Sequence, residues 1–364
     1  MKNMITVCMI VKNESHLIKE TLKAINRYGY ELVIVDTGSE DNTKEIALSY
    51  TDKIYDFKWN YNFSDARNFA LKKASNEFVL MIDADEVIVD FDTKNIEKMI
   101  TLNPMVVGRI SIVNEFKYNK NASKSIEKVS RLFSKKYYKY EGAIHEQLIS
   151  IYNREIKKID IPLRVLHKGY TEEEIVRKNK LNRNVSMLKA ELEVNSEDPY
   201  LLYQLGKTYY IMEDYKSSYD CFYKAMDIDL DINLEYVHEL VECYGYCLLN
   251  MKKYKEALKI VNLYEMFSSS SDYIFLIGLI YMNNGMFNEA CNEFIKCTQM
   301  KNGKVEGVNG DLAFYNIGVI YECLGKFDYA EKYYAKCKKY RSAKERIERI
   351  REIGVDKKKK KNKI

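Results

Sequence analysis

Three acidic residues follow a buried apolar run in the first quarter of the chain. The stretch FVLMIDADEV, residues 78–87, places Asp83, Asp85 and Glu86 directly after residues that are typical of a buried strand. Buried carboxylates are costly unless they are paired, hydrogen-bonded or bound to a metal ion. On an extended segment Asp83 and Asp85 would point to one face, because they are two residues apart. The pattern therefore predicts a bound cation or another ligand at this point.

Further polar residues end two earlier apolar runs. Asp36 closes LVIVD, residues 32–36, and Asn13 with Glu14 follows the run of residues 4–11. Each has two interpretations, since such side chains either bind a ligand or cap the helix that comes next. For Asp36 the helix to be capped would follow Ser39.

These residues need a sheet to position them, and the sequence predicts one. Apolar runs at 4–11, 32–36 and 77–82 alternate with segments of helical periodicity at 14–27, 40–50 and 64–74. Such alternation is typical of a parallel sheet covered on both faces. Ligands of these sheets bind beyond the carboxyl ends of the strands. Extended segments are expected further on, at 105–117, 128–134 and 158–167.

The second half of the chain carries an internal repeat. Gly206, Gly245, Gly278 and Gly318 each open a unit with an aromatic residue nine positions later. A small residue follows at twelve positions, and a large apolar residue follows at sixteen, namely Phe222, Val261, Phe294 and Tyr334. The small residues would let paired helices approach closely, while the aromatic rings fill the space between them. The pattern resembles the tetratricopeptide repeat and predicts stacked helix pairs.

Composition limits the classes of protein that fit this chain. Its 364 residues suit two domains, with 46% hydrophobic and 30% charged residues. The net charge of +5 becomes −1 without residues 357–364, which hold six lysines, so no nucleic-acid footprint is expected. That Lys-rich end is expected to be a frayed, solubilising tail or a contact to an anionic surface. We expect no signal peptide, no membrane-spanning segment and a cytoplasmic protein with unpaired thiols.

Four stretches in order resemble the inverting family 2 glycosyltransferases of GT-A fold. They are ITVCMIVKNES (5–15), ELVIVDTGSEDNT (31–43), FKWNYNFSDARNFAL (57–71) and LMIDADE (80–86). EGAIHEQL (141–148) and VLHKGY (165–170) are similar to segments of the members that carry tetratricopeptide repeats. The resemblance implies an α/β, Rossmann-like nucleotide-sugar domain at 1–170. A linking helix (171–198), an all-α repeat domain with a closing helix (199–353) and a disordered tail (354–364) would follow.

The resemblance also implies roles for individual residues. A Mn²⁺ or Mg²⁺ ion would stabilise the charge that grows on the donor's diphosphate as the sugar leaves. Asp85 would bind this ion, Asp83 would bind the donor's ribose or the ion's waters, and Asp36 would bind uracil. Arg67 and Asn68 lie near the start of a helix opened by Ser64 and are expected to bind the donor. Arg67 could fork onto the diphosphate or stack on the base; the alternative is a surface pair with Asp65.

Two later segments supply the remaining candidates. An inverting transfer needs a base for the acceptor's proton, and Glu146 fits that role, with His145 as its neighbour or as a second choice. His167 ends the run IPLRVLH and resembles the late histidine that reaches the metal or the diphosphate in GT-A enzymes.

The function expected is sugar transfer from a nucleotide-sugar donor, UDP-linked by resemblance, to a peptide or protein recognised with the help of the repeats. One alternative is assembly of a cell-surface glycan, with the repeats used for homodimerisation or scaffolding. Transfer of a sugar phosphate is another activity that this fold could carry. A non-enzymatic alternative is a protein-binding module on a relic transferase fold, which loss of Asp85 or of the acidic base would have favoured. Both acids are present, so an enzyme is expected.

Overall fold

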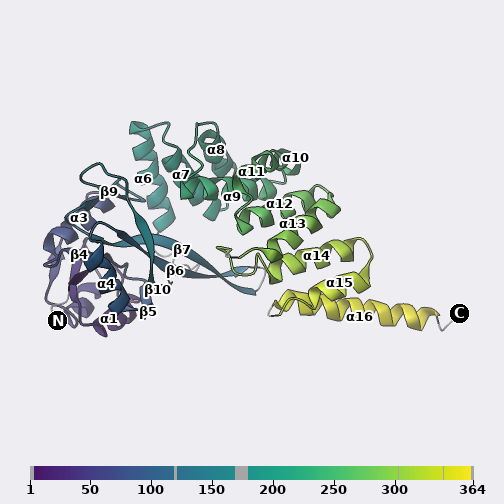
Figure 1. The fold of residues 1–364 in the computed structure, drawn as a ribbon, viewed down its shortest axis with the longest axis horizontal. Helices are drawn as coiled ribbons and strands as arrows, with labels where there is room; N and C mark the ends of the chain where they lie inside the picture. Colours follow the sequence, from purple (N-terminus) through teal and green to yellow (C-terminus); the bar gives the residue numbers. More distant parts are fainter. Residues whose placement is uncertain (1–3, 119–120, 169–178, 302, 339, 362–364) are drawn as a thin grey trace. The chain divides into compact units, whose positions relative to one another are not determined.

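A computed structural model describes residues 4–118, 121–168, 179–301, 303–338 and 340–361. The chain divides into two compact units, Met1–Phe116 with Lys124–Glu191, and Lys117–Ser123 with Leu192–Ile364 (Figure 1). The division falls inside the predicted linking helix, 171–198. Residues 171–178 of that helix and residues 169–170, the end of VLHKGY, lie outside the described residues.

The first unit contains an eight-stranded mixed sheet in the order β3-β2-β1-β4-β7-β6-β10-β5. The parallel half, β3-β2-β1-β4, comes from the predicted alternating region, while β4 pairs with β7 and β5 pairs with β10 in antiparallel fashion. Two short strands, β8 and β9, form a second antiparallel sheet. The strands are β1 (Ile5–Val11), β2 (Glu31–Asp36), β3 (Ile54–Asp56), β4 (Phe78–Met81), β5 (Glu86–Phe91), β6 (Val107–Tyr118), β7 (Asn121–Ser134), β8 (Tyr138–Glu141), β9 (Gln147–Ser150) and β10 (Lys158–His167).

Helices cover both faces of the parallel half, as the continuous apolar strands predicted. Along β2, Leu32 and Ile34 join one buried apolar cluster, whereas Val33 and Val35 join another on the opposite face. Because successive side chains of a strand alternate, such a strand is apolar throughout when both faces are covered. Helix α1 packs on the first cluster and α3 on the second. The helices are α1 (Ile18–Asn26), α2 (Thr43–Leu48), α3 (Phe63–Lys73), α4 (Thr93–Leu102) and α6 (Lys180–Val194).

A charged network fixes the amino end of β2, opposite the edge where ligands bind. Glu31 accepts hydrogen bonds from Lys53 Nζ, from Ser75 Oγ at 2.6 Å and from the Thr6 hydroxyl. Burial alone would raise the pKa of the Glu31 carboxyl, but these hydrogen bonds outweigh burial and lower the pKa to about 2. The ionised form of Glu31 therefore stabilises the folded unit.

The second unit is a series of helix pairs, which confirms the predicted repeat. An ideal Cβ atom placed on three of the four repeat glycines would lie 2.5–2.6 Å from the aromatic ring sixteen residues later. The helices can therefore approach this closely only where no side chain intervenes. The pairs in contact are Gly206 with Phe222, Gly278 with Phe294 and Gly318 with Tyr334.

Gly245 departs from this pattern. Its Cβ position lies against Leu276 at 2.6 Å and not against Val261, the large apolar residue expected there. Val261 belongs to a 3₁₀ helix, Leu258–Leu263, whose tighter winding changes the direction of its side chains. The second repeat is therefore irregular.

The helices of the second unit end in a long closing helix. They are α7 (Pro199–Ile211), α8 (Tyr215–Met226), α9 (Glu235–Asn250), α10 (Tyr254–Ala257), α11 (Tyr264–Phe267), α12 (Ser271–Asn283), α13 (Phe287–Gln299), α14 (Asp311–Cys323), α15 (Phe327–Tyr334) and α16 (Arg341–Lys361). Residues 354–361 are thus helical, contrary to the disordered tail predicted from 354 onward. Lysine has good helix propensity, so a Lys run can continue a helix that is already formed.

The eight cysteines are free thiols. Five of them are buried, whereas Cys243 and Cys291 are half-buried and Cys323 is exposed. Within the ranges that the structure describes, no helix is both long enough and apolar enough to cross a membrane.

Candidate functional site

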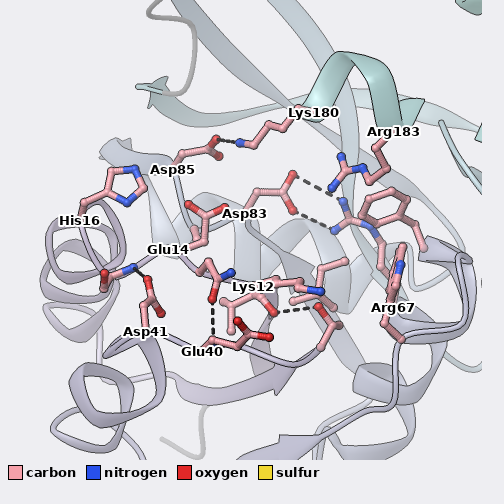
Figure 2. A pocket seen from close by; sticks show the side chains of 18 of the residues that line it. Lys12, Glu14, His16, Glu40, Asp41, Arg67, Asp83, Asp85, Lys180 and Arg183 are labelled. Atoms are coloured by element: carbon pink, nitrogen blue, oxygen red, sulfur yellow. Dashed lines mark hydrogen bonds and ion pairs between the residues drawn. The ribbon is translucent and has the colours of Figure 1, made fainter. Parts of the chain in front are cut away.

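A cavity of about 820 Å³ opens in the first unit beyond the carboxyl ends of β1 and β4 (Figure 2). Strand register explains its position, because Val11 pairs with Asp36 and Cys8 pairs with Met81, so the loops that follow these strands share one edge. Six of the predicted site residues line the cavity: Asn13, Glu14, Arg67, Asp83, Asp85 and His167. The other four do not, namely Asp36, Asn68, His145 and Glu146.

Asn13 joins the loop after β1 to the loop after β2. Its side-chain Oδ1 accepts a hydrogen bond from Glu40 N at 2.8 Å, and its own N–H donates to Ser39 Oγ at 3.0 Å. Its φ of 55° lies in the left-handed region, which asparagine tolerates better than most residues. Helix α1 begins at Ile18 after Leu17, so Asn13 does not cap that helix. Asn13 shapes the cavity wall.

Asp36 has one carboxylate oxygen that the described residues leave unbonded. Oδ1 accepts from Gly38 N and Ser39 N, both at 2.8 Å, which closes a tight turn. Oδ2 is buried and has no hydrogen-bond partner among the described residues. The helix that Asp36 might have capped begins at Thr43 after Asn42, so capping does not explain this carboxylate. A buried acceptor without a partner fits a ligand N–H.

Two arginines neutralise most of the acidic cluster at the end of β4. Arg67 Nη1 donates to Asp83 Oδ1 at 3.0 Å, and Arg131 Nη2 donates to Asp83 Oδ2 at 2.6 Å and to Glu86 Oε1 at 2.8 Å. Burial alone would raise the pKa of Asp83, but Arg131 and Arg67 outweigh it and hold that pKa well below its usual range. Burial does raise the pKa of Glu86, although Arg131 opposes this.

Asp83 and Asp85 do not lie on one extended face. Residues Ala84 and Asp85 form a turn, closed by a hydrogen bond from Glu86 N to Asp83 O at 3.1 Å. The turn sends the two carboxylates to different partners, so the extended geometry predicted for this segment is wrong. Only Asp85 retains a carboxylate that is not paired with arginine.

Asp85 faces His167 from the neighbouring strand end. Their closest atoms, Asp85 Oδ2 and His167 Nε2, are 3.3 Å apart, and His167 Nδ1 lies 2.8 Å from Asn114 Oδ1. Since the amide oxygen can only accept, Nδ1 carries the proton and Nε2 is directed at Asp85. Burial alone would lower the pKa of His167, but the hydrogen bond with Asp85 outweighs burial and raises it.

The Asp85–His167 pair could hold a divalent cation if a bound ligand supplied the remaining coordinating atoms. Carboxylate oxygen and imidazole nitrogen are accepted ligand atoms of such ions, and Asn114 fixes the ring as outer-shell partners do. Among the described residues no group of three or more acidic, histidine or cysteine ligands occurs. Magnesium-type sites commonly combine one or two protein groups with substrate phosphates and water. A cation held here would therefore need a phosphate-bearing ligand.

The remaining predicted residues lie behind the cavity wall. Both polar groups of the Asn68 amide bond to the Tyr140 backbone, at 2.8 and 2.9 Å, so Asn68 anchors β8. Arg67 Nε donates to Glu146 Oε1, which places Glu146 on the same guanidinium as Asp83. Arg67 therefore does not form the predicted alternative pair with Asp65. His145 has φ 51° in the turn before Glu146.

Helix α3 positions the loop that carries Glu146. Phe63 N donates to Ala143 O at 2.8 Å, and Ser64 Oγ donates to Gly142 O at 2.6 Å. These contacts join residues that are almost eighty positions apart in the sequence. The stretches FKWNYNFSDARNFAL and EGAIHEQL thus form one wall of the site.

Several site residues were not predicted. Arg131 and Asn114 come from β7 and β6, while Lys180 and Arg183 come from α6. In the sequence, Asn114 stands out as a polar residue within the strand segment RISIVNEF. Its position opposite His167 depends on strand register, which the sequence alone does not give. The signal for Arg131 was a charged residue in a segment expected to be extended.

The two parts of the chain match known families. Residues 6–159 match the model of glycosyl transferase family 2. Residues 199–232, 271–303 and 312–344 match a tetratricopeptide repeat model. The matched repeats contain Gly206, Gly278 and Gly318, whereas the irregular unit of Gly245 is not matched.

Three curated proteins have sequences that are similar to parts of this chain. The prophage-derived glycosyltransferase SunS of Bacillus subtilis strain 168 is 27% identical over 227 residues, 61% of this chain and 53% of that protein. A TPR repeat-containing protein of Synechococcus elongatus is 26% identical over 56% of this chain and 51% of its own length. A poly-beta-1,6-N-acetyl-D-glucosamine synthase of Staphylococcus epidermidis is 34% identical over 30% of this chain and 31% of that protein.

The chain spans about half the length of the first two of these relatives. The matches agree with the fold, since a GT-A-like mixed sheet occupies the first unit and helix pairs occupy the second. The chain therefore carries a segment that matches glycosyl transferase family 2, followed by segments that match the tetratricopeptide repeat.

Proposed function

We propose that this chain transfers a sugar, with inversion, from a nucleotide-sugar donor to a peptide or protein acceptor, and that the reaction depends on Mn²⁺ or Mg²⁺. The observation that carries the proposal is the Asp85–His167 pair at the cavity, in which Asp85 belongs to the segment that matches glycosyl transferase family 2 and His167 follows shortly after its end. Asp85 and His167 would hold the cation. When bound, the cation would stabilise the negative charge of the departing diphosphate.

The donor's nucleotide is proposed to be a uridine nucleotide. Asp36 Oδ2 is a buried acceptor without a partner among the described residues, and uracil has one N–H that can donate to it. Asn13, whose side chain is bonded to Glu40, would hold the surrounding loop in place. Glu14 also lines the cavity and is proposed to bind the donor.

Glu146 is proposed as the base that accepts the acceptor's proton. Its carboxyl group forms an ion pair with Arg67, which holds the side chain in one orientation. The guanidinium of Arg67 also forms an ion pair with Asp83, so one side chain connects the proposed base with a proposed donor-binding residue. His145 is the second choice for the base.

The repeats are proposed to recognise the acceptor. A stacked helical array offers an extended surface for a peptide, and the family 2 match ends before the repeats begin. The alternative acceptor is a growing cell-surface glycan, which the similarity to a poly-beta-1,6-N-acetyl-D-glucosamine synthase favours. In that case the repeats would serve dimerisation or docking to a scaffold.

Acceptor transfer measured by mass spectrometry separates these two proposals. The full chain would be incubated with Mn²⁺ and a panel of nucleotide sugars, together with either a peptide library or short β-linked glycans. A mass increase of one sugar on peptides supports the peptide acceptor, whereas elongation of glycans alone supports the alternative.

Truncation after residue 195 tests the role of the repeats. The fragment keeps every proposed donor-binding residue, so donor hydrolysis should persist while transfer to the peptide collapses. Thermal unfolding of the fragment serves as the control for its fold. Unchanged kcat/KM for the peptide in a folded fragment would place acceptor recognition in the first unit.

A further inference from the structure

Helix α6 brings two cations into the donor cavity from outside the segment that matches family 2. Lys180 and Arg183 lie one turn apart, so they share a face of the helix, and both line the cavity. Figure 2 shows both side chains extending from α6 toward the acidic side chains of the site. The family match ends at residue 159, so α6 lies outside the matched segment.

Lys180 lies beside the proposed cation ligand. Its Nζ atom is 3.8 Å from Asp85 Oδ2, which is longer than the 2.7–2.9 Å typical of a charged hydrogen bond. An ammonium group has three donors and no acceptor. Lys180 can therefore stay near Asp85 while it donates to a second anion in the cavity.

Arg183 is held in place by an aromatic ring. Its guanidinium carbon lies 5.1 Å from the centroid of Phe63, and its Nη2 is 3.0 Å from Asn184 Oδ1. Phe63 is the first residue of α3, the helix that also supplies Arg67. Asn184 accepts from the Nε and Nη2 atoms of this guanidinium, and its other N–H donors can reach a phosphate oxygen.

The charge of the cavity shows why these cations matter. Its lining contains five carboxylates, which are Glu14, Glu40, Asp41, Asp83 and Asp85, and four lysine or arginine side chains. Arg67 is already paired with two carboxylates, Asp83 and Glu146. Without α6 the lysine and arginine side chains of the lining would be Lys12 and the paired Arg67, against four carboxylates besides the arginine-paired Asp83, an environment that disfavours a diphosphate.

We propose that Lys180 and Arg183 bind the diphosphate of the nucleotide-sugar donor, with Lys180 placed between Asp85 and a phosphate oxygen. This inference rests on the proposed function of the cavity. It makes α6 part of the donor site and assigns to it a share of the charge stabilisation during departure of the nucleotide. The family 2 segment alone would then bind the nucleotide weakly.

Calorimetric binding of UDP and of uridine to the full chain, with Mn²⁺ present, tests the proposal. Lys180→Met and Arg183→Met should each weaken UDP binding about tenfold or more and leave uridine binding unchanged, because only UDP carries the diphosphate. Lys180→Arg and Arg183→Lys should recover most of the UDP affinity. Lys189→Met, an exposed cation of the same helix that does not line the cavity, is the matched control and should bind both compounds normally.

The outcomes separate this inference from the proposed function. Wild-type UDP affinity in both methionine variants, or an equal loss of UDP and uridine binding, would overturn the role of α6 while leaving the donor site intact. A wild-type chain that binds none of UDP, GDP and dTDP would overturn the proposed function together with this inference. Circular dichroism and thermal unfolding would show that each variant is folded.

Discussion

Replacing Asn114 with leucine should weaken Mn²⁺ binding at the proposed cation site without touching either ligand. Asn114 Oδ1 lies 2.8 Å from His167 Nδ1 and is the acceptor that orients the ring. Leucine would leave a partly buried N–H without this acceptor, at a cost of about 1–3 kcal/mol. Since about 1.4 kcal/mol is a factor of ten, the expected loss of affinity is about 10- to 100-fold, the range typical of outer-shell partners.

The assay is titration of Mn²⁺ into the full chain in the presence of UDP, which supplies the missing phosphate ligands. Asn114→Asp is the matched control, because it keeps an oxygen acceptor for the ring N–H. Its Mn²⁺ affinity should therefore stay close to that of the wild-type chain and exceed that of Asn114→Leu. Wild-type Mn²⁺ affinity in a folded Asn114→Leu variant would refute the role of His167 as a metal ligand.

Three further predictions follow from the contacts described above. Glu146→Gln should lower turnover by a factor of about 10² or more with little change in donor affinity. If Glu146→Gln lowers turnover less than His145→Ala does, His145 and not Glu146 is the base. Glu31→Gln should lower the free energy of unfolding near pH 7 by up to about 3 kcal/mol, since the pKa of Glu31 falls from 4.5 unfolded to about 2 folded. This stabilisation is present above pH 4.5 and is lost as the pH falls toward 2, so wild-type and variant denaturation curves should converge there; a constant difference would contradict the assignment. Gly278→Ala should destabilise the repeats by about 1–2 kcal/mol in denaturant unfolding, because the Cβ overpacks against a ring at 2.6 Å; an unfolding midpoint equal to that of the wild-type chain would contradict this packing.

Local patterns predicted the elements well. The strand predicted at 158–167 coincides with β10, and the helix predicted at 64–74 differs from α3, Phe63–Lys73, by one residue at each end. Apolar runs and their alternation with helical periodicity are local properties, so one sequence suffices to read them. The repeat was equally readable, because Gly278 and Phe294 contact each other at a fixed spacing.

The partners of the acids could not be predicted in the same way. The three acids at residues 83–86 suggested a cation, but Arg67 and Arg131 pair with two of them. Arg131 reaches Asp83 because β7 lies beside β4 in the sheet, and strand order is a long-range property that spacing does not encode. The same holds for Lys180, which approaches Asp85 from a helix almost a hundred residues later.

Nucleotide release from a panel of nucleotide sugars, measured for the wild-type chain and for Asp85→Asn, tests the central claim most directly. The wild-type chain should release nucleotide from at least one donor in Mn²⁺ and lose that activity in EDTA. Asp85→Asn should be inactive in Mn²⁺ while its thermal unfolding shows a folded protein, because the amide removes the anionic ligand of the proposed cation site. Full activity in EDTA, or wild-type turnover by Asp85→Asn, would contradict metal-dependent sugar transfer at this site.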